Sequence, residues 1–180
     1  MDKADILQAL SRLGELSQEA GLRLEVSIYG GSAMLLAYDS RAATKDIDAV
    51  LVPREEGQRL VQVVARELSM PEDWLNSDVA QFVSPVKEEK RRLRAIEEET
   101  GLIVRVPTAK YLLAMKTLAC RRPIGAYQGD AEDLRFLIKK IGIRSVDQMQ
   151  EAVDAFFPND VITESNRLFL KTLIGEAYEE

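Results

Sequence analysis

The sequence predicts an α/β fold, an α+β arrangement in which a small β-sheet core precedes a C-terminal helical region. Short apolar strand patterns alternate with helical patterns over residues 1–107. From residue 108 onward the apolar periodicity is helical throughout. A chain of 180 residues that is 46% hydrophobic can also bury a core without disulfides or a structural metal. We therefore expect an α/β core at 1–107 and a helical region at 108–180 packed on it.

The elements of the first part follow from periodicity and from glycine and proline positions. The predicted elements are a helix ending near Gly21, a strand over 24–29, a short helix capped by Ser32, a strand over 46–52 and a helix over 54–69. Residues 70–95 predict an irregular connection with one short turn of structure, and the charge run at 87–94 predicts a solvated face. A third strand is predicted over 102–106.

The second part predicts four helices, each preceded by a residue that suits an N-cap. Their predicted ranges are 108–121, 130–141, 146–157 and 163–178, with caps at Thr108, Asp130, Ser145 and Thr163. Ser145 and Gln148 also have the spacing of a capping box.

The composition excludes several classes of chemistry. The absence of histidine excludes a Ser-His-Asp triad and a histidine-ligated zinc, and the single cysteine excludes an intramolecular disulfide. A balance of 24 basic and 30 acidic residues disfavours a general nucleic-acid coat. The N-terminus lacks a signal-peptide pattern and no apolar run approaches eighteen residues, so we expect a cytoplasmic protein without membrane contact.

Two short segments carry the residues best suited to a catalytic site. Gly30-Gly31-Ser32 follows a predicted strand, and thirteen residues separate it from Asp46 and Asp48 at the start of the next strand. Glycine lets the backbone approach a phosphate closely, and the following helix presents free N–H groups. Carboxylates two residues apart on a strand share a face and can hold a divalent metal. Together the segments predict a site for a triphosphate and a metal ion.

The two acids have a simpler alternative, the solvent-facing half of an edge strand. The face that carries Asp46 and Asp48 continues as Val50 and Val52, while the opposite face is apolar. Apolar residues on both faces predict a central strand that is buried on both sides. We therefore expect the acids to mark a site.

These residues resemble the signature of a known superfamily. Gly31-Ser32 followed after thirteen residues by Asp46-Ile47-Asp48 is similar to the motif of nucleotidyltransferases related to DNA polymerase β. The wider layout resembles small bacterial members, including the abortive-infection nucleotidyltransferase toxins of type IV toxin–antitoxin systems. The resemblance spans about residues 25 to 138. It implies a small mixed β-sheet core, an NTP substrate, and Mg²⁺ or Mn²⁺ held by the two aspartates.

A second match lies in the helical part, where Lys116 is followed by Arg121 and then by Asp130 and Asp133. In the relatives a lysine-bearing helix, an arginine and a following Asp-x-x-Asp close the site. The resemblance thus implies nucleotide contacts by Lys116 and Arg121. Structural alternatives stay open: Lys116 as the polar edge of a packed helix, Arg121 as a complement to the helix dipole, and the two acids as an N-cap and a first-turn acid.

The sequence departs from the family pattern at one point. Active members commonly carry a third carboxylate on a later strand, whereas 102–106 contains no acid. Three explanations stay open: Asp130 or Asp133 substitutes, the metal is held weakly, or the enzyme is impaired.

The resemblance implies a metal-dependent enzyme that transfers a nucleotidyl group from an NTP to a hydroxyl of RNA, protein or a small molecule. A toxin that acts on tRNA or protein and pairs with an antitoxin is one version of this function. The alternative is a catalytically impaired module of the same fold that binds a nucleotide or a protein partner.

Overall fold

The computed structural model describes residues 1–124 and 129–179. The chain folds into two compact units. The first unit comprises Met1–Gln81 and Lys90–Val106, and the second comprises Phe82–Glu89 and Pro107–Glu180. Residues 82–89 therefore belong with the C-terminal helices, although they lie within the part of the sequence that we assigned to the core.

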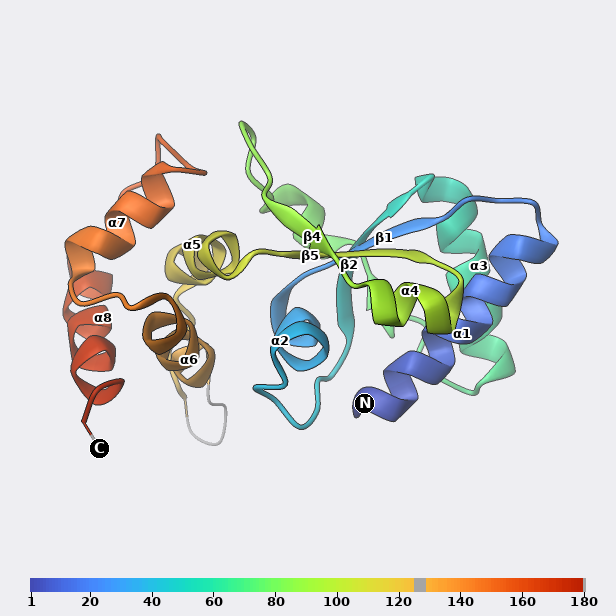
Figure 1. The fold of residues 1–180 in the computed structure, drawn as a ribbon, viewed down its shortest axis with the longest axis horizontal. Helices are drawn as coiled ribbons and strands as arrows, with labels where there is room; N and C mark the ends of the chain where they lie inside the picture. Colours follow the sequence, from blue (N-terminus) through green and yellow to red (C-terminus); the bar gives the residue numbers. More distant parts are fainter. Residues whose placement is uncertain (125–128, 180) are drawn as a thin grey trace. The chain divides into compact units, whose positions relative to one another are not determined.

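The first unit is built on a mixed five-stranded sheet with the strand order β3-β2-β1-β5-β4 (Figure 1). β1 is antiparallel to β2 and parallel to β5, and β2 is parallel to β3. The strands are β1 (Glu25–Ile28), β2 (Ile47–Val52), β3 (Leu75–Asn76), β4 (Lys90–Arg92) and β5 (Ile103–Pro107). The predicted fold class, α+β with a small mixed sheet, is confirmed.

Helices complete the first unit. They are α1 (Lys3–Glu19), α2 (Gly30–Tyr38), α3 (Arg54–Glu67) and α4 (Arg94–Thr100), together with the 3₁₀ turn η1 (Asp78–Gln81). α1 lies alongside α3 and α4 (Figure 1). Its apolar residues recur at helical spacing and are buried, among them Ile6, Leu10 and Leu13. An Asp2–Asp5 capping box fixes where this helix begins.

The prediction that β2 is buried on both faces is wrong. Ile47, Ala49 and Leu51 are buried, but the opposite face is half-buried at Asp48 and Val50, and Val52 is 58% exposed. Valine suits a pleated strand whether or not its side chain is covered, so its presence did not report burial. Asp48 therefore lies on the more open face of the sheet.

Residues 70–100 contain more regular structure than the sequence predicted. Trp74 is buried, and its indole Nε1 donates to the Val61 carbonyl of α3 at 3.1 Å, while the two residues that follow it form β3 and pair with β2. The charge run that predicted a solvated face contains strand β4 and the start of α4. The sequence did not predict α4, because most of its side chains are charged and only Ile96 and Thr100 are buried, which leaves no apolar periodicity to detect.

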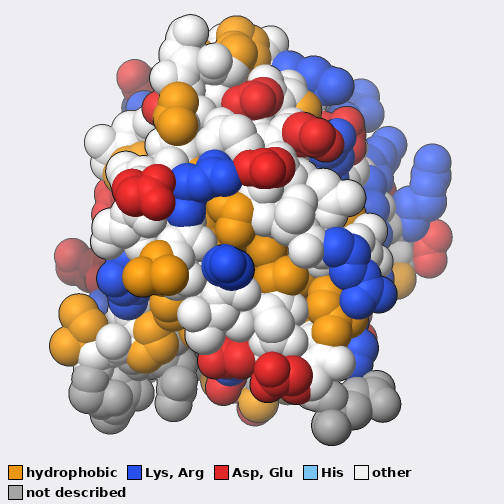
Figure 2. Space-filling view, turned by 90° about the vertical axis from the view of Figure 1, so that its left-hand side faces the viewer, with side chains coloured by type: hydrophobic (Ala, Val, Ile, Leu, Met, Phe, Trp, Pro, Cys, Tyr) orange, Lys and Arg blue, Asp and Glu red, His pale blue; other side chains and the backbone are white. Residues whose placement is uncertain are grey.

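The second unit consists of α5 (Ala109–Ala119), α6 (Ala131–Ile141), α7 (Val146–Asp154) and α8 (Glu164–Glu176), with the segment 82–89. Thr108, Ser145 and Thr163 accept capping hydrogen bonds as predicted. Gln148 instead accepts from the Arg144 N–H, so the predicted capping box at Ser145 is incomplete. On the outer surface of α7 and α8, acidic and basic side chains are interspersed with apolar ones (Figure 2).

Among the described residues, every helix is too short or too polar to cross a membrane.

Candidate functional site

The glycine pair forms the junction between β1 and α2. Tyr29 is the extended N-cap residue, and its N–H donates to the Asp48 carbonyl at 2.8 Å. α2 therefore begins at Gly30, not after Ser32 as the predicted cap required. The Ser32 hydroxyl is buried and donates to the Tyr29 carbonyl at 3.0 Å, so it stabilises the first turn from within. The residue that we expected to cap the helix lies inside it.

Gly30 lies directly against the carboxylate of Asp48. A Cβ placed on Gly30 would be 2.7 Å from Asp48 Oδ2, closer than a real Cβ contact allows. Gly30 also has a φ of +60°, a left-handed conformation that favours glycine. The backbone conformation and the contact between the start of α2 and β2 therefore each favour glycine here.

Gly31 faces a different pair of side chains. A Cβ on Gly31 would lie 3.1 Å from Arg41 Nη1 and 3.2 Å from Thr44 Oγ1. Both residues come from the connection between α2 and β2. Because β1 and β2 are antiparallel neighbours, this connection returns to the end of β1 where the glycines lie. We did not predict Arg41 or Thr44, although polar residues between the two halves of the motif were a usable signal.

Asp46 lies in the bend that leads into β2, one residue before the strand, and is half-buried. Its carbonyl accepts a hydrogen bond from the Thr44 hydroxyl at 3.1 Å. Between the two aspartates, Ile47 is buried and its N–H donates to the Trp74 carbonyl at 2.8 Å. The short strand β3 thus fixes the backbone from which Asp46 and Asp48 project.

An arginine lies two strands away from β2 on the face of the sheet that carries Asp48. Ser27 of β1 pairs with Val50 on one side and with Arg105 of β5 on the other, so these positions share that face. Arg105 Nε donates to Glu25 Oε1 at 2.8 Å, and Lys90 Nζ donates to Ser27 Oγ at 3.1 Å. Arg105 therefore lies on the strand where a third acid was expected, and Lys90 lies on the adjacent strand β4.

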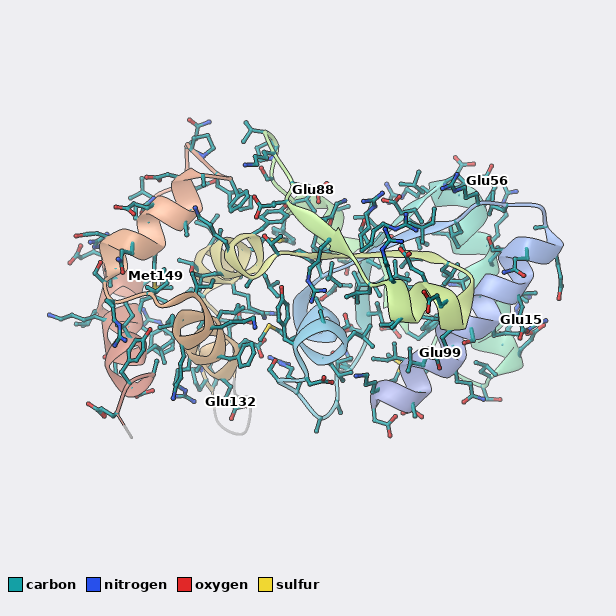
Figure 3. The ribbon with its side chains drawn as sticks, viewed as in Figure 1. Glu15, Glu56, Glu88, Glu99, Glu132 and Met149 are labelled. Carbon is teal, nitrogen blue, oxygen red and sulfur yellow. The ribbon has the colours of Figure 1, made fainter. Side chains whose placement is uncertain are left out.

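Other acids of the first unit are dispersed. Three exposed glutamates labelled in Figure 3 come from separate helices: Glu15 from α1, Glu56 from α3 and Glu99 from α4. Within residues 1–124 and 129–179, no group of three or more Asp, Glu, Cys or His side chains is arranged to hold a metal ion. The candidate metal site of this unit therefore has two carboxylates.

The remaining predicted site residues form a buried ion cluster in the second unit. Lys116 Nζ lies 2.9 Å from Asp130 Oδ1 and 2.7 Å from Asp133 Oδ2, and Arg121 Nε lies 2.9 Å from Asp130 Oδ2. The side chains of Lys116, Asp130 and Asp133 are 4%, 0% and 1% exposed. The cluster connects α5 to α6, with both aspartates paired to Lys116.

The charges in this cluster set the ionisation of Asp130. Burial by itself raises the pKa of Asp130, but the hydrogen bonds and positive charges of Arg121 and Lys116 outweigh it and lower the pKa to about 2. The predicted capping hydrogen bond of Asp130 is not made, because its oxygens accept from Lys116 and Arg121 instead. The prediction that Lys116 and Arg121 contact a phosphate stays a prediction. In this structure both side chains are paired with Asp130.

The fold and the site together define a class of protein. A mixed sheet in which a Gly-Gly turn opens a helix against an Asp-x-Asp strand is the arrangement expected of the nucleotidyltransferase superfamily. Residues 5–170 match the model of a family described as nucleotidyltransferase of unknown function (DUF6036), and the chain belongs to this family. No curated protein matches the chain, and no solved structure does.

Proposed function

We propose that this protein transfers a nucleotidyl group from a nucleoside triphosphate to a hydroxyl acceptor in a metal-dependent reaction. One observation carries the proposal: the Asp48 carboxylate lies directly against Gly30 at the first turn of α2. A phosphate bound at the free N–H groups of that turn would thereby lie beside a metal-binding carboxylate. Membership in a nucleotidyltransferase family supports the same chemistry.

Asp46 and Asp48 fit a divalent cation. Carboxylate oxygens are the ligands that Mg²⁺ and Mn²⁺ prefer, and both aspartates are half-buried rather than sealed from solvent. A bound ion would neutralise charge that develops as pyrophosphate leaves. Gly30 and Gly31 would let the backbone N–H groups approach the phosphates closely, and Ser32 stabilises the turn that presents these groups. Transfer by a toxin to tRNA or protein is one form that this activity can take.

A second candidate is a nucleotide-binding module without catalytic activity. Arg105 favours it, because it lies on strand β5, where the family pattern has the third carboxylate of the metal site. Such a module would bind an NTP and leave its α-phosphate intact.

The test follows the α-phosphate. The protein is incubated with each of four α-³²P-labelled NTPs, Mg²⁺ or Mn²⁺, and total cellular RNA and protein as acceptors. The wild type is expected to label an acceptor, and Asp46→Asn with Asp48→Asn to reduce labelling roughly a hundredfold or more. The matched control carries Glu55→Gln with Glu56→Gln, two exposed acids of α3.

Equal labelling by the wild type and the aspartate double variant would overturn the assignment. Metal-dependent NTP binding in calorimetry without any label transfer would support the non-catalytic module instead.

A further inference from the structure

We infer that Arg41, supported by Thr44, forms the cationic side of the phosphate site and contacts the terminal phosphates of the bound nucleotide. The inference rests on the proposed function and names a residue that neither half of the glycine–aspartate motif contains. It also assigns the countercharge to Arg41 in place of Lys116.

The two glycines have oppositely charged neighbours. The Asp48 carboxylate lies against Gly30, and the Arg41 guanidinium with the Thr44 hydroxyl lies against Gly31. Adjacent Cα atoms are about 3.8 Å apart, so both groups border the same peptide of α2's first turn. A ligand bound over this peptide would meet an anionic group at one end and a cationic group at the other.

The positive charge of Arg41 lies at the positive, N-terminal end of the α2 dipole, where a cation is not stabilised. The N-terminal end of a helix carries a partial positive charge, and cations are stabilised at the opposite end. A guanidinium beside the second residue of α2 therefore adds positive charge where the backbone already supplies it. Arg41 and Asp48 both have polar or electrostatic partners in the protein, and a triphosphate offers more negative charge than one carboxylate. An anion bound at the turn would make this placement favourable.

The loop that carries Arg41 is held by its own contacts. α2 ends at Tyr38, and the left-handed conformation of its C-cap residue, Asp39, turns the chain away from the helix. The Thr44 hydroxyl donates to the Asp46 carbonyl at 3.1 Å, which connects the loop to the start of β2. The segment that positions Arg41 is thus continuous with the segment that positions the metal-binding aspartates.

This geometry assigns a direction to the nucleotide. The α-phosphate, where transfer occurs, would lie on the Asp48 side with the metal ion. The β- and γ-phosphates would then extend along the N–H groups toward Gly31 and Arg41. Binding through Arg41 is accordingly expected to depend on the number of phosphates.

Lys116 is less suited to this role in the structure as it stands. Its ammonium is 4% exposed and bridges two buried carboxylates, Asp130 and Asp133. Together with Arg121 it already balances the charges of those two carboxylates, so a further anion would compete with both. Arg41 is half-buried and lies beside the glycines themselves.

The test is calorimetry of the 180-residue chain with ATP, CTP, GTP and UTP in the presence of Mg²⁺, and with the diphosphate and monophosphate of whichever base binds. Arg41→Gln is expected to weaken triphosphate binding roughly 10- to 100-fold, the range for loss of a charge-assisted hydrogen bond. Monophosphate binding should change by less than about threefold. Arg59→Gln, an exposed arginine of α3 with a 76% exposed side chain, is the matched control and should bind like the wild type.

Arg41→Lys and Thr44→Val provide variants that keep most of the packing if Arg41→Gln fails to fold. Arg41→Lys keeps the charge but loses the planar fork, so an intermediate affinity supports the inference. A wild type that binds triphosphate and an Arg41→Gln variant that binds it equally would overturn the inference while the proposed function stands. An equal loss for triphosphate and monophosphate would also overturn it. A wild type that binds none of the four NTPs would overturn the proposed function itself.

Discussion

The two units of this protein use ionised side chains in opposite ways. In the second unit, Lys116, Asp130 and Asp133 are sealed from solvent, and each charge faces an opposite one within 3 Å. In the first unit, Asp48 lies half-buried on the more open face of a sheet, with its carboxylate against Gly30 at the start of α2. Both sets of residues belong to sequence patterns that the family resemblance places in one site.

The difference shows how burial distinguishes two roles for charge. A sealed cluster exchanges solvation for internal pairing, so removal of one member leaves another charge buried without compensation. A half-buried carboxylate keeps part of its hydration and can exchange it for a metal or a ligand. We therefore expect variants of the cluster to act first on stability and variants of the glycine turn to act first on nucleotide binding.

The largest effect is expected at Lys116. Lys116→Met removes the cation that pairs with two buried aspartates, and breaking a buried pair of this kind costs about 3–5 kcal/mol of unfolding free energy. The control Lys110→Met replaces an exposed lysine of the same helix, and it should change the unfolding free energy by less than about 0.5 kcal/mol. Urea denaturation followed by circular dichroism measures both. Equal stability of the two variants would remove the distinction between the units.

A smaller effect is expected on acidification. The folded pKa of Asp130 is about 2, below its ordinary value of 3.8, so its contribution to stability is complete above about pH 4. The contribution is lost as the pH falls from about 4 toward 2, and it amounts to about 2 kcal/mol. Unfolding free energies of the wild type and Asp130→Asn, measured between pH 5 and pH 2, should show a steeper decline for the wild type. Parallel curves would contradict this account of the cluster.

The smallest effect on stability is expected at Gly30, where binding should change most. Gly30→Ala places a side chain in a left-handed conformation, which costs about 1–2 kcal/mol, and pushes it against the Asp48 carboxylate. Gly21→Ala is the matched control, because Gly21 has a φ of +63° and a Cβ placed on it would meet nothing within 4 Å. Thermal unfolding compares their stabilities, and calorimetry with Mg²⁺ and an NTP compares their binding.

Both variants carry the cost of a side chain in a left-handed conformation, and Gly30→Ala should lose somewhat more stability because its Cβ also displaces the Asp48 carboxylate. Only Gly30→Ala should also lose nucleotide affinity, because only there does the new Cβ displace a proposed metal ligand. Equal affinities for the two variants would mean that Asp48 does not contribute to the site through its contact with Gly30.

Much of the local structure was predictable from the sequence. The helices that follow Thr108, Ser145 and Thr163 begin where those residues cap them, because a cap depends on three or four consecutive residues. β1 and β5 lie close to their predicted ranges. The short strand β3 escaped prediction because its pairing partner, β2, is distant in sequence and decides whether two residues count as a strand.

The site was predictable in part for the same reason. The sequence alone determined that a strand, two glycines and a helix precede an Asp-x-Asp strand, since turn chemistry and side-chain alternation are local properties. Only the tertiary structure placed Arg41 against Gly31, put Arg105 on the face of Asp48 and enclosed Lys116 between two aspartates. Those contacts join residues through the packing of separate elements, and the pairing of distant charges is not encoded in any local pattern.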